Sequence, residues 1–318
     1  MHHVVFIAFD GFQLLDLTGP ASVYGAANDR LGRKVYQIDM MTPNTKTALS
    51  SCGVSVSTKT CADIHPASVD SFFISGGNVD GQKAFIANDC VKDWVWKAIP
   101  SSIRYGSICS GSVALAAWGL IGTRRFAAHW DAVSEIRRRF PELQLDAESL
   151  YVNDGPLWTS AGVTAGIDMA LAIVEVDHGP DVARAVAQRL VLSVRRPGWQ
   201  SQYSPALAAQ GTRDGRYADV IAWIAINLAD DLCVDRLAER AGESPRSFHR
   251  NFTTVVGDTP ARYVMSQRLD HARALIEQGH SLKSVASQCG FIDPAPLSKA
   301  FKSRFGMTAG AYRLVNGR

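Results

Sequence analysis

The chain has 318 residues, of which 47% are hydrophobic and 20% are charged, which is typical of a globular protein long enough for two domains. The net charge of +3 is unevenly distributed, because residues 213–318 carry 15 Lys and Arg against 11 Asp and Glu. This net of +4 permits a nucleic-acid partner for that region, and the six scattered cysteines without a CxxC pair exclude a disulfide framework and a structural zinc site.

The first residues contain no targeting signal. Met1–Phe9 is a short apolar run without the basic flank and cleavage site of a secretory signal. No apolar stretch of the chain approaches the length of a membrane span. The sequence therefore predicts a cytoplasmic protein with reduced thiols that binds no membrane, and no motif indicates a metal or another cofactor.

Short apolar runs alternate with helical patterns over the first two-thirds of the chain. The apolar runs are Val4–Phe9, Val35–Met40, Ser71–Ile74 and Ile103–Ile108; the helical patterns follow Pro20 and cover Ser110–Leu120, Ile167–Val176 and Pro180–Val194. Such runs are typical of strands buried on both faces, and the alternation predicts an α/β fold with a parallel sheet.

The remaining third of the chain has only helical patterns. These cover Tyr217–Leu228, Val234–Ala241, Ser244–Val255, Pro260–Glu277, Ser281–Gln288 and Asp293–Arg304. The preceding stretch is rich in Pro, Gly, Ser, Gln and Tyr, which is typical of a connector. We predict an α/β domain over residues 1–195, a linker over 196–215 and an all-α domain over 216–318.

The all-α region contains one helical unit twice. The first copy includes Leu237-Ala238, Gly242, Phe248, Phe252 and Gly257, and the second includes Val285-Ala286, Gly290, Leu297, Phe301 and Gly306. The offset is 48 residues up to the first glycine and 49 beyond it, so one residue is inserted at the turn. Each copy has a short helix, a turn glycine and a second helix with a capping residue, Ser244 or Asp293. This pattern predicts two helix-turn-helix units.

The second helix of each unit has an apolar face and a face left for DNA. Because Phe248 and Phe252 face the core, as do Leu297 and Phe301, the opposite side of each helix points outward. The predicted DNA-binding residues are Ser244, Arg246, Ser247, His249 and Arg250 in the first unit, and Ala295, Ser298, Lys299 and Lys302 in the second. A plain helical bundle with a solvated charged face is the alternative, and the duplication makes it less favoured.

These residues resemble a known family. From about Arg216 to Arg313 the chain is similar to the DNA-binding domain of AraC/XylS regulators, on the basis of Gly257-Asp258-Thr259-Pro260, Arg268-Leu269, Cys289-Gly290-Phe291 and Phe301 to Gly306. The resemblance implies that a linking helix holds two reading helices against successive major-groove faces of promoter DNA. The linking segment Pro260–Glu277 would be roughly 27 Å long at helical rise, compatible with about 34 Å per DNA turn.

The second unit departs from the family pattern, because Pro294 and Pro296 flank Ala295. These residues offer no hydrogen bonds to bases. We therefore expect Arg246, His249 and Arg250 to read most of the sequence, and the second unit to contact phosphates or read weakly.

Cys109 lies between a predicted strand and a predicted helix, in Gly106-Ser107-Ile108-Cys109-Ser110-Gly111. This is the arrangement of a nucleophile elbow, which exposes the sulfur and aims a helix N-terminus at it. We expect this position to favour the thiolate, with the N–H groups of Ser110 and of Gly76-Gly77 as an oxyanion hole. A lone cysteine among small residues is also typical of a buried packing position.

Residues 1 to about 195 resemble the DJ-1/PfpI branch of the class I glutamine amidotransferase-like superfamily, a flavodoxin-like α/β sandwich. The motifs that carry the resemblance are Asp10-Gly11, Asp16 to Pro20, Ser75-Gly76-Gly77, the Cys109 elbow, His129-Trp130 and Thr159 to Gly162. The resemblance implies Cys109, His129 and Asp16 as candidate catalytic residues. It implies a ligand site of Asp16, Gly76, Gly77, Cys109, Ser110, His129 and Trp130.

The fusion of these two domains resembles the GlxA-like regulators, in which the amidotransferase-like fold senses a metabolite. The resemblance implies a DNA-binding regulator, most often an activator, with double-stranded promoter DNA, RNA polymerase and a small-molecule effector as partners and a homodimer as the assembly. Amino acids and quaternary amines are effector classes among relatives, and Trp130 and Trp158 are candidate walls for a cationic ligand.

Two alternatives stay open. A cysteine-dependent hydrolase or hydratase would use Cys109, but no residue evidently orients His129 as a triad requires. A redox sensor would need an exposed Cys109 thiol of low pKa. The sequence favours a regulator over an enzyme.

Overall fold

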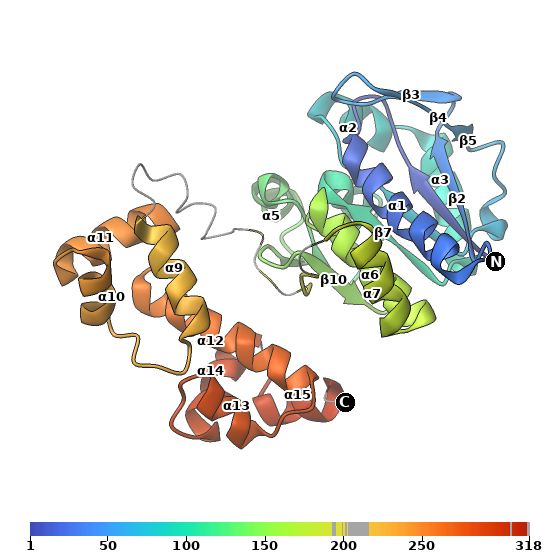
Figure 1. The fold of residues 1–318 in the computed structure, drawn as a ribbon. Helices are drawn as coiled ribbons and strands as arrows, with labels where there is room; N and C mark the ends of the chain where they lie inside the picture. The colour runs from blue at the N-terminus through green and yellow to red at the C-terminus, as the bar shows by residue number, and fades with distance from the viewer. Residues whose placement is uncertain (193–194, 199, 201, 203–215, 306, 317–318) are drawn as a thin grey trace. The chain divides into compact units, whose positions relative to one another are not determined.

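The computed structural model describes residues 1–192, 195–198, 200, 202, 216–305 and 307–316. The chain divides into two units, Met1–Gln202 and Tyr203–Arg318, which run from blue to yellow-green and from yellow to red in Figure 1. Each unit has hydrophobic cores of its own. No helix within the described ranges is long and apolar enough to cross a membrane.

A seven-stranded sheet forms the middle layer of the first unit, with the strand order β10-β11-β7-β6-β1-β2-β5. The strands are β1 His2–Ile7, β2 Tyr36–Thr42, β5 Lys59–Thr60, β6 Ser71–Ile74, β7 Arg104–Ile108, β10 Tyr151–Asp154 and β11 Leu157–Ser160. All neighbours are parallel except β10 and β11. The strands at the centre are buried on both faces, as their apolar runs predict, and the predicted α/β fold is confirmed.

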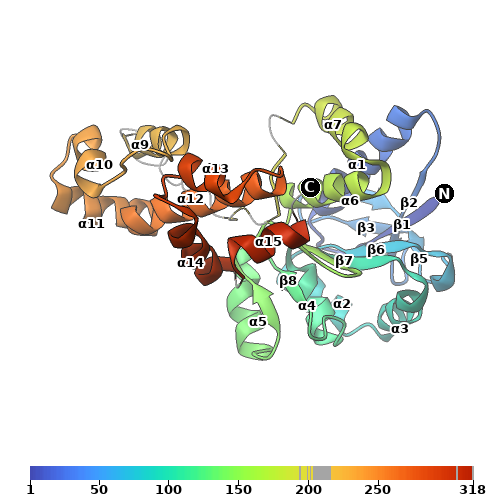
Figure 2. The same cartoon turned by 90° about the horizontal axis from the view of Figure 1, so that it is seen from below.

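Helices cover both faces of this sheet (Figure 2). On one face lie α1 Leu14–Leu31, α6 Thr164–His178 and α7 Pro180–Arg189, and on the other lie α2 Val79–Ile86, α3 Asp89–Ala98 and α4 Ser112–Ala117. Leu17, Ile173 and Val186 belong to the first core, and Phe85, Trp94 and Leu115 to the second. The unit is therefore a three-layer sandwich, whose elbow lies at the carboxyl end of β7.

Smaller elements fill the edges of the first unit. They are β3 Thr47–Leu49 paired with β4 Ser55–Ser57, β8 Arg125–Ala127 paired with β9 Gln144–Asp146, helix α5 Val133–Arg139, and the 3₁₀ turns Pro66–Ser68, Ile99–Ser101, Cys109–Gly111 and Trp130–Ala132. No pattern in the sequence predicts these elements. The helix predicted over Ser110–Leu120 is also shorter, because the Cys109–Gly111 turn precedes α4.

The second unit is helical throughout its described residues. Its helices are α9 Arg216–Ile226, α10 Val234–Ala241, α11 Pro245–Val256, α12 Pro260–Glu277, α13 Leu282–Gln288, α14 Pro294–Phe305 and α15 Ala309–Asn316. One core gathers residues of α9, α10 and α11, and a separate core gathers residues of α13, α14 and α15. Helix α12 contributes Tyr263 and Val264 to the first of these cores and Leu269 and Ala272 to the second. Figure 1 shows α12 between the helices α9 to α11 and the helices α13 to α15. It is the linking helix that the sequence predicts.

The duplicated pattern has a duplicated structure. Gly242 and Gly290 follow α10 and α13 with φ of +65° and +69°, a left-handed backbone that glycine adopts without strain. The Ser244 hydroxyl accepts a hydrogen bond from the N–H of Ser247 at 3.3 Å, and Asp293 Oδ1 accepts one from Ala295 at 2.7 Å. Both side chains therefore cap the helices they precede, as the sequence predicts.

Residues 195–202 of the predicted boundary region make several contacts with the first unit where they are described. The N–H groups of Leu150 and Tyr151 donate to the carbonyls of Gln200 and Gly198 at 3.0 and 3.1 Å. The remainder of the predicted linker, 203–215, lies outside the described residues. The domain limits at 195 and 216 stay a prediction.

Candidate functional site

Cys109 has the backbone of an elbow. Its φ is +58°, a conformation that a side chain other than glycine adopts only under strain, and it connects β7 directly to a 3₁₀ turn. The surrounding glycines allow this close approach. A Cβ on Gly76 would lie 2.7 Å from Cys109 Cβ, and a Cβ on Gly111 would lie 2.3 Å from the Ile74 carbonyl oxygen. The predicted elbow geometry is therefore present.

Asp16, on the first turn of α1, joins three separate segments at the elbow. Its Oδ2 accepts a hydrogen bond from the N–H of Gly76 and its Oδ1 accepts one from Val163, both at 2.9 Å. The Cys109 thiol interacts electrostatically with this carboxyl. Burial raises the pKa of this carboxyl to about 6, although the hydrogen bonds act in the opposite direction. Asp16 is fully buried. Its raised pKa lies about one unit below neutral pH.

The environment of Cys109 favours the neutral thiol, contrary to the expectation that the elbow favours a thiolate. Burial, followed by the neighbouring Asp16 carboxylate, raises the pKa of Cys109 to about 12. The side chain is also buried instead of exposed. Helix α4 has six residues and begins at Ser112, three residues after Cys109, so the helix predicted to start at the elbow starts later. The redox-sensor alternative loses the low-pKa, exposed thiol on which it depends.

The predicted oxyanion hole is engaged within the protein. The N–H of Gly76 donates to Asp16, and the N–H of Gly77 donates to Ser110 Oγ at 3.2 Å. The neighbouring Ser110 lowers the pKa of the Cys109 thiol, against the effect of burial. These donors, which sequence reasoning assigned to a developing negative charge, instead hold the elbow together.

His129 and Trp130 belong to another segment than the elbow, at the start of the 3₁₀ turn Trp130–Ala132. The Nδ1 atom of His129 accepts a hydrogen bond from the N–H of Asp131 at 3.4 Å, and burial lowers the pKa of the ring. Among the described residues, no hydrogen bond or ion pair joins His129 to Cys109 or Asp16. Trp130 is 51% exposed, with its ring centroid 5.2 Å from that of His129, whereas Trp158 is buried in the core. The hydrogen bonds that define a catalytic triad are therefore not formed among these residues in the described part of the chain.

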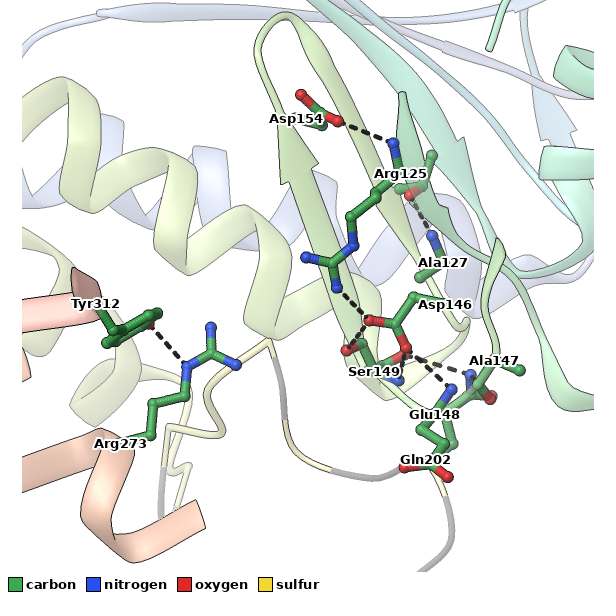
Figure 3. A network of polar contacts seen from close by, with 11 residues as sticks. Arg125, Ala127, Asp146, Ala147, Glu148, Ser149, Asp154, Gln202, Arg273 and Tyr312 are labelled. Atoms are coloured by element: carbon green, nitrogen blue, oxygen red, sulfur yellow. Dashed lines mark hydrogen bonds and ion pairs between the residues drawn. The ribbon is translucent and has the colours of Figure 1, made fainter. Parts of the chain in front are cut away.

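Sequence reasoning missed a polar network beside this turn, drawn in Figure 3. Asp146 of β9 accepts hydrogen bonds from Arg125 Nη2 and Ser149 Oγ, both at 2.8 Å. Gln202 Nε2 donates to the carbonyls of Ala128, Ala147 and Ser149 at 2.9, 3.1 and 3.3 Å. Gln202 thus binds the residue that precedes His129. The partners are mostly main-chain atoms, which leave no side-chain pattern in a sequence.

Arg196, six residues before Gln202, also binds the first unit, through α6. Its Nε donates to Asp168 Oδ2 at 2.8 Å and its Nη2 donates to Thr164 Oγ1 at 2.8 Å, both on α6. Thr164 directly follows Val163, whose N–H binds Asp16. One end of α6 therefore contacts both the elbow and the segment that leads out of the first unit.

The predicted reading residues of α11 lie on one surface. Arg246, His249 and Arg250 are exposed, whereas Phe248 and Phe252 are fully buried. Ser247 is half-buried and donates its N–H to the capping Ser244. The exposed face carries two guanidinium groups, the donors best suited to guanine O6 and N7.

Helix α14 presents different chemistry on the equivalent face. Ala295, Lys299 and Lys302 are exposed and Ser298 is half-buried, over the buried Leu297 and Phe301. The lysines are suited to phosphate contacts. No group of His, Cys, Asp and Glu side chains that could hold a metal ion occurs in the part of the chain that the structure describes.

Two family models match the chain: the DJ-1/PfpI family over residues 2–176 and a helix-turn-helix domain over residues 237–314. HTH-type transcriptional regulator GlxA of Rhizobium meliloti is 30% identical over 322 residues, covering 100% of this chain and 97% of the relative. The chain belongs to the HTH-type transcriptional regulators with a DJ-1/PfpI domain. HTH-type transcriptional regulator CdhR of Pseudomonas aeruginosa is 28% identical over 311 residues, covering 98% of this chain and 91% of the relative.

A solved structure of a THiJ/PfpI family protein from Pseudomonas syringae has the same fold as the first unit. It matches with a TM-score of 0.54 at 21% identity, covering 76% of this chain and 88% of that chain. As a member of this regulator family, the chain is a DNA-binding transcriptional regulator, as its duplicated unit predicts.

Proposed function

We propose that this regulator binds a small-molecule effector at the Cys109 elbow and promoter DNA through α11 and α14. In this proposal it acts in the cytoplasm as a homodimer, with domains over residues 1–195 and 216–318, and activates transcription through RNA polymerase. The observation that carries the effector site is Asp16, a buried carboxyl that joins α1, the Gly76 turn, Cys109 and the start of α6.

The chemistry of Asp16 favours a cationic effector. An ionised carboxylate buried without a cation is unfavourable, and a bound ammonium would offset that penalty. The half-exposed Trp130 ring offers the aromatic face that cations prefer. Amino acids and quaternary amines, the classes implied by the family resemblance, both carry such a charge. Trp158 is buried in the core and leaves the proposed aromatic wall to Trp130.

The first turn of α6 supports a route from this site to the linker. Val163 binds Asp16, and Arg196 binds Thr164 and Asp168. A ligand that changes how Asp16 holds Val163 would move the same turn that holds Arg196. Coupling then requires that the ligand bind the two arrangements of this turn with different affinity.

A thermal-shift screen of glycine betaine, carnitine and the free amino acids on the full-length chain tests the effector site. A ligand at a hundredfold excess over its Kd stabilises the folded state by about 2.7 kcal/mol. We expect a shift that Asp16→Asn abolishes and that Asp181→Asn, a substitution at an exposed carboxylate, retains. An undiminished shift in Asp16→Asn would contradict the site.

The strained backbone of Cys109 is the observation that favours the alternative, a cysteine-dependent enzyme. The raised pKa of the thiol, the engaged N–H donors and the lack of a hydrogen bond from His129 to Cys109 among the described residues oppose it. Turnover of an isonitrile, amide or 2-oxoaldehyde by the full chain, lost in Cys109→Ala, would favour the enzyme. Ligand-dependent DNA binding that persists in Cys109→Ala would favour the regulator without chemistry at sulfur.

A further inference from the structure

Arg268, in the middle of α12, binds the main chain between α9 and α10, a segment whose Leu228 packs in the core of the first helix-turn-helix unit. Its Nε donates to the carbonyl of Leu228 at 3.0 Å and its Nη2 donates to the carbonyl of Asp230 at 2.6 Å. Both carbonyls lie just beyond the C-terminal end of α9, where a cation is favourable and the last carbonyls lack helical partners. Leu228 is itself buried in the first core. Arg268 therefore holds the helices of the first helix-turn-helix unit to the linking helix α12.

The turn of the second unit packs against the same group. A Cβ placed on Gly290 would lie 2.6 Å from the Leu228 carbonyl oxygen and 2.7 Å from Arg268 Nη2. The turn of the second helix-turn-helix unit thus lies against both the Arg268 guanidinium and the Leu228 carbonyl, which belongs to the core of the first helix-turn-helix unit. The equivalent glycine of the first unit, Gly242, has nothing within 4 Å of a Cβ although its φ is nearly the same.

This contact joins two parts that have separate cores. The residues buried around Phe252 and those buried around Phe301 form different clusters, and α12 contributes to both. A single helix can bend and twist between two such bodies. A charge-assisted contact off the helix axis removes that freedom.

We propose that Arg268, the Leu228 carbonyl and Gly290 form a clamp that fixes the orientation of α14 relative to α11, with Arg268 as a positioning residue for DNA binding. The proposal rests on the binding of both helices to DNA. Because the contact holds the two helix-turn-helix units at a fixed distance, the second unit reaches the duplex without a further loss of conformational entropy on binding.

Hydroxyl-radical footprinting of the full-length chain on a duplex that the wild-type protein selects from random-sequence DNA tests the clamp. We expect wild type to protect two segments whose centres lie about one helical turn apart. Arg268→Ala should keep the first segment, whereas the second should lose contrast and spread along the duplex. The affinity should fall about tenfold, because the second unit is no longer pre-positioned.

Three further variants separate the positioning effect of Arg268 from the effect of its charge and from an effect on folding. Arg268→Lys keeps the charge but not the two-pronged donor, and we expect it to restore the second segment only in part. Gly290→Ala should reproduce the footprint of Arg268→Ala. Gly242→Ala has the same backbone strain without the crowding, and should keep both segments sharp. If Arg268→Ala fails to fold, which circular dichroism would reveal, the two glycine variants decide the question.

Equal weakening of both segments in Arg268→Ala, or a wild-type footprint in Gly290→Ala, would overturn the clamp. The absence of any sequence-dependent footprint with wild type would instead overturn the proposed mode of DNA binding. The two failures are therefore distinguishable.

Discussion

The two helix-turn-helix units of this regulator share their buried residues and differ in their exposed ones. Phe252 and Phe301 are both fully buried, and Ser244 and Asp293 both cap the helix that follows them. On the exposed faces, Arg246, His249 and Arg250 of α11 correspond to a segment of α14 that begins with Pro294, Ala295 and Pro296. The scaffold is therefore duplicated, while the exposed guanidinium groups, the donors best suited to guanine, are concentrated in one of the two units.

The turns differ in a second way. The turn at Gly242 has free space around it, whereas the turn at Gly290 packs against Arg268 and the Leu228 carbonyl. The unit with fewer base-reading side chains is the one whose turn contacts the other unit. This contrast supports a division of roles, in which the first unit chooses the sequence and the second adds phosphate contacts from a fixed position.

Truncation of the core should have the largest effect on the comparison. Phe252→Ala and Phe301→Ala should each lower the free energy of unfolding of their own unit by about 3–5 kcal/mol, because each removes a fully buried ring. Hydrogen exchange should show the loss of protection mainly in the substituted unit, since the cores are separate. The exposed Thr254→Ala is the control. Equal loss of protection in both units would contradict separate cores.

Removal of a guanidinium from α11 should have the next largest effect. Arg250→Ala should weaken binding to the preferred sequence by about 1–3 kcal/mol and relax the preference at one position, as expected for a lost contact to guanine. Lys299→Ala should instead weaken binding to all sequences alike and reduce the salt dependence by about one counterion. Fluorescence anisotropy at several salt concentrations measures both. A sequence-specific loss in Lys299→Ala would remove the distinction between the units.

Loss of a cap should have the smallest effect and should be similar in both units. Ser244→Ala and Asp293→Ala should each lower the free energy of unfolding by about 1 kcal/mol. The corresponding glycine variants should lose only a few tenths of a kcal/mol, since glycine tolerates the cap conformation. Urea denaturation measures the difference. An unchanged free energy of unfolding in the alanine variants would show that neither side chain acts as a cap.

The features that the sequence predicted correctly depend on local spacing. The period of Phe248 and Phe252 gives the buried face of α11, the turn glycines have positive φ, and Ser244 and Asp293 cap where the helical pattern begins. The small residues around Cys109 likewise predicted its elbow. Each of these signals is contained in a few consecutive residues.

The features that the sequence did not predict depend on contacts between distant segments. Burial against Asp16 reverses the expected pKa shift of Cys109, and Asp16 itself is held by N–H groups 60 and 147 residues away in the chain. Arg268 and Gln202 bind main-chain carbonyls, and the position of a main-chain carbonyl cannot be predicted from the residue types. Desolvation and main-chain partners follow from the packed structure and have no periodic pattern.

The most direct test of the account is selection of binding sites from random duplex DNA by the full-length protein, with Arg250→Ala and Lys299→Ala in parallel. We expect wild type to enrich one strongly specified half-site containing guanine and, about one helical turn away, a weakly specified one. Arg250→Ala should lose the strong preference, while Lys299→Ala should retain it with a lower yield. Two equally specified half-sites, or an unchanged motif in Arg250→Ala, would contradict the division between the two units.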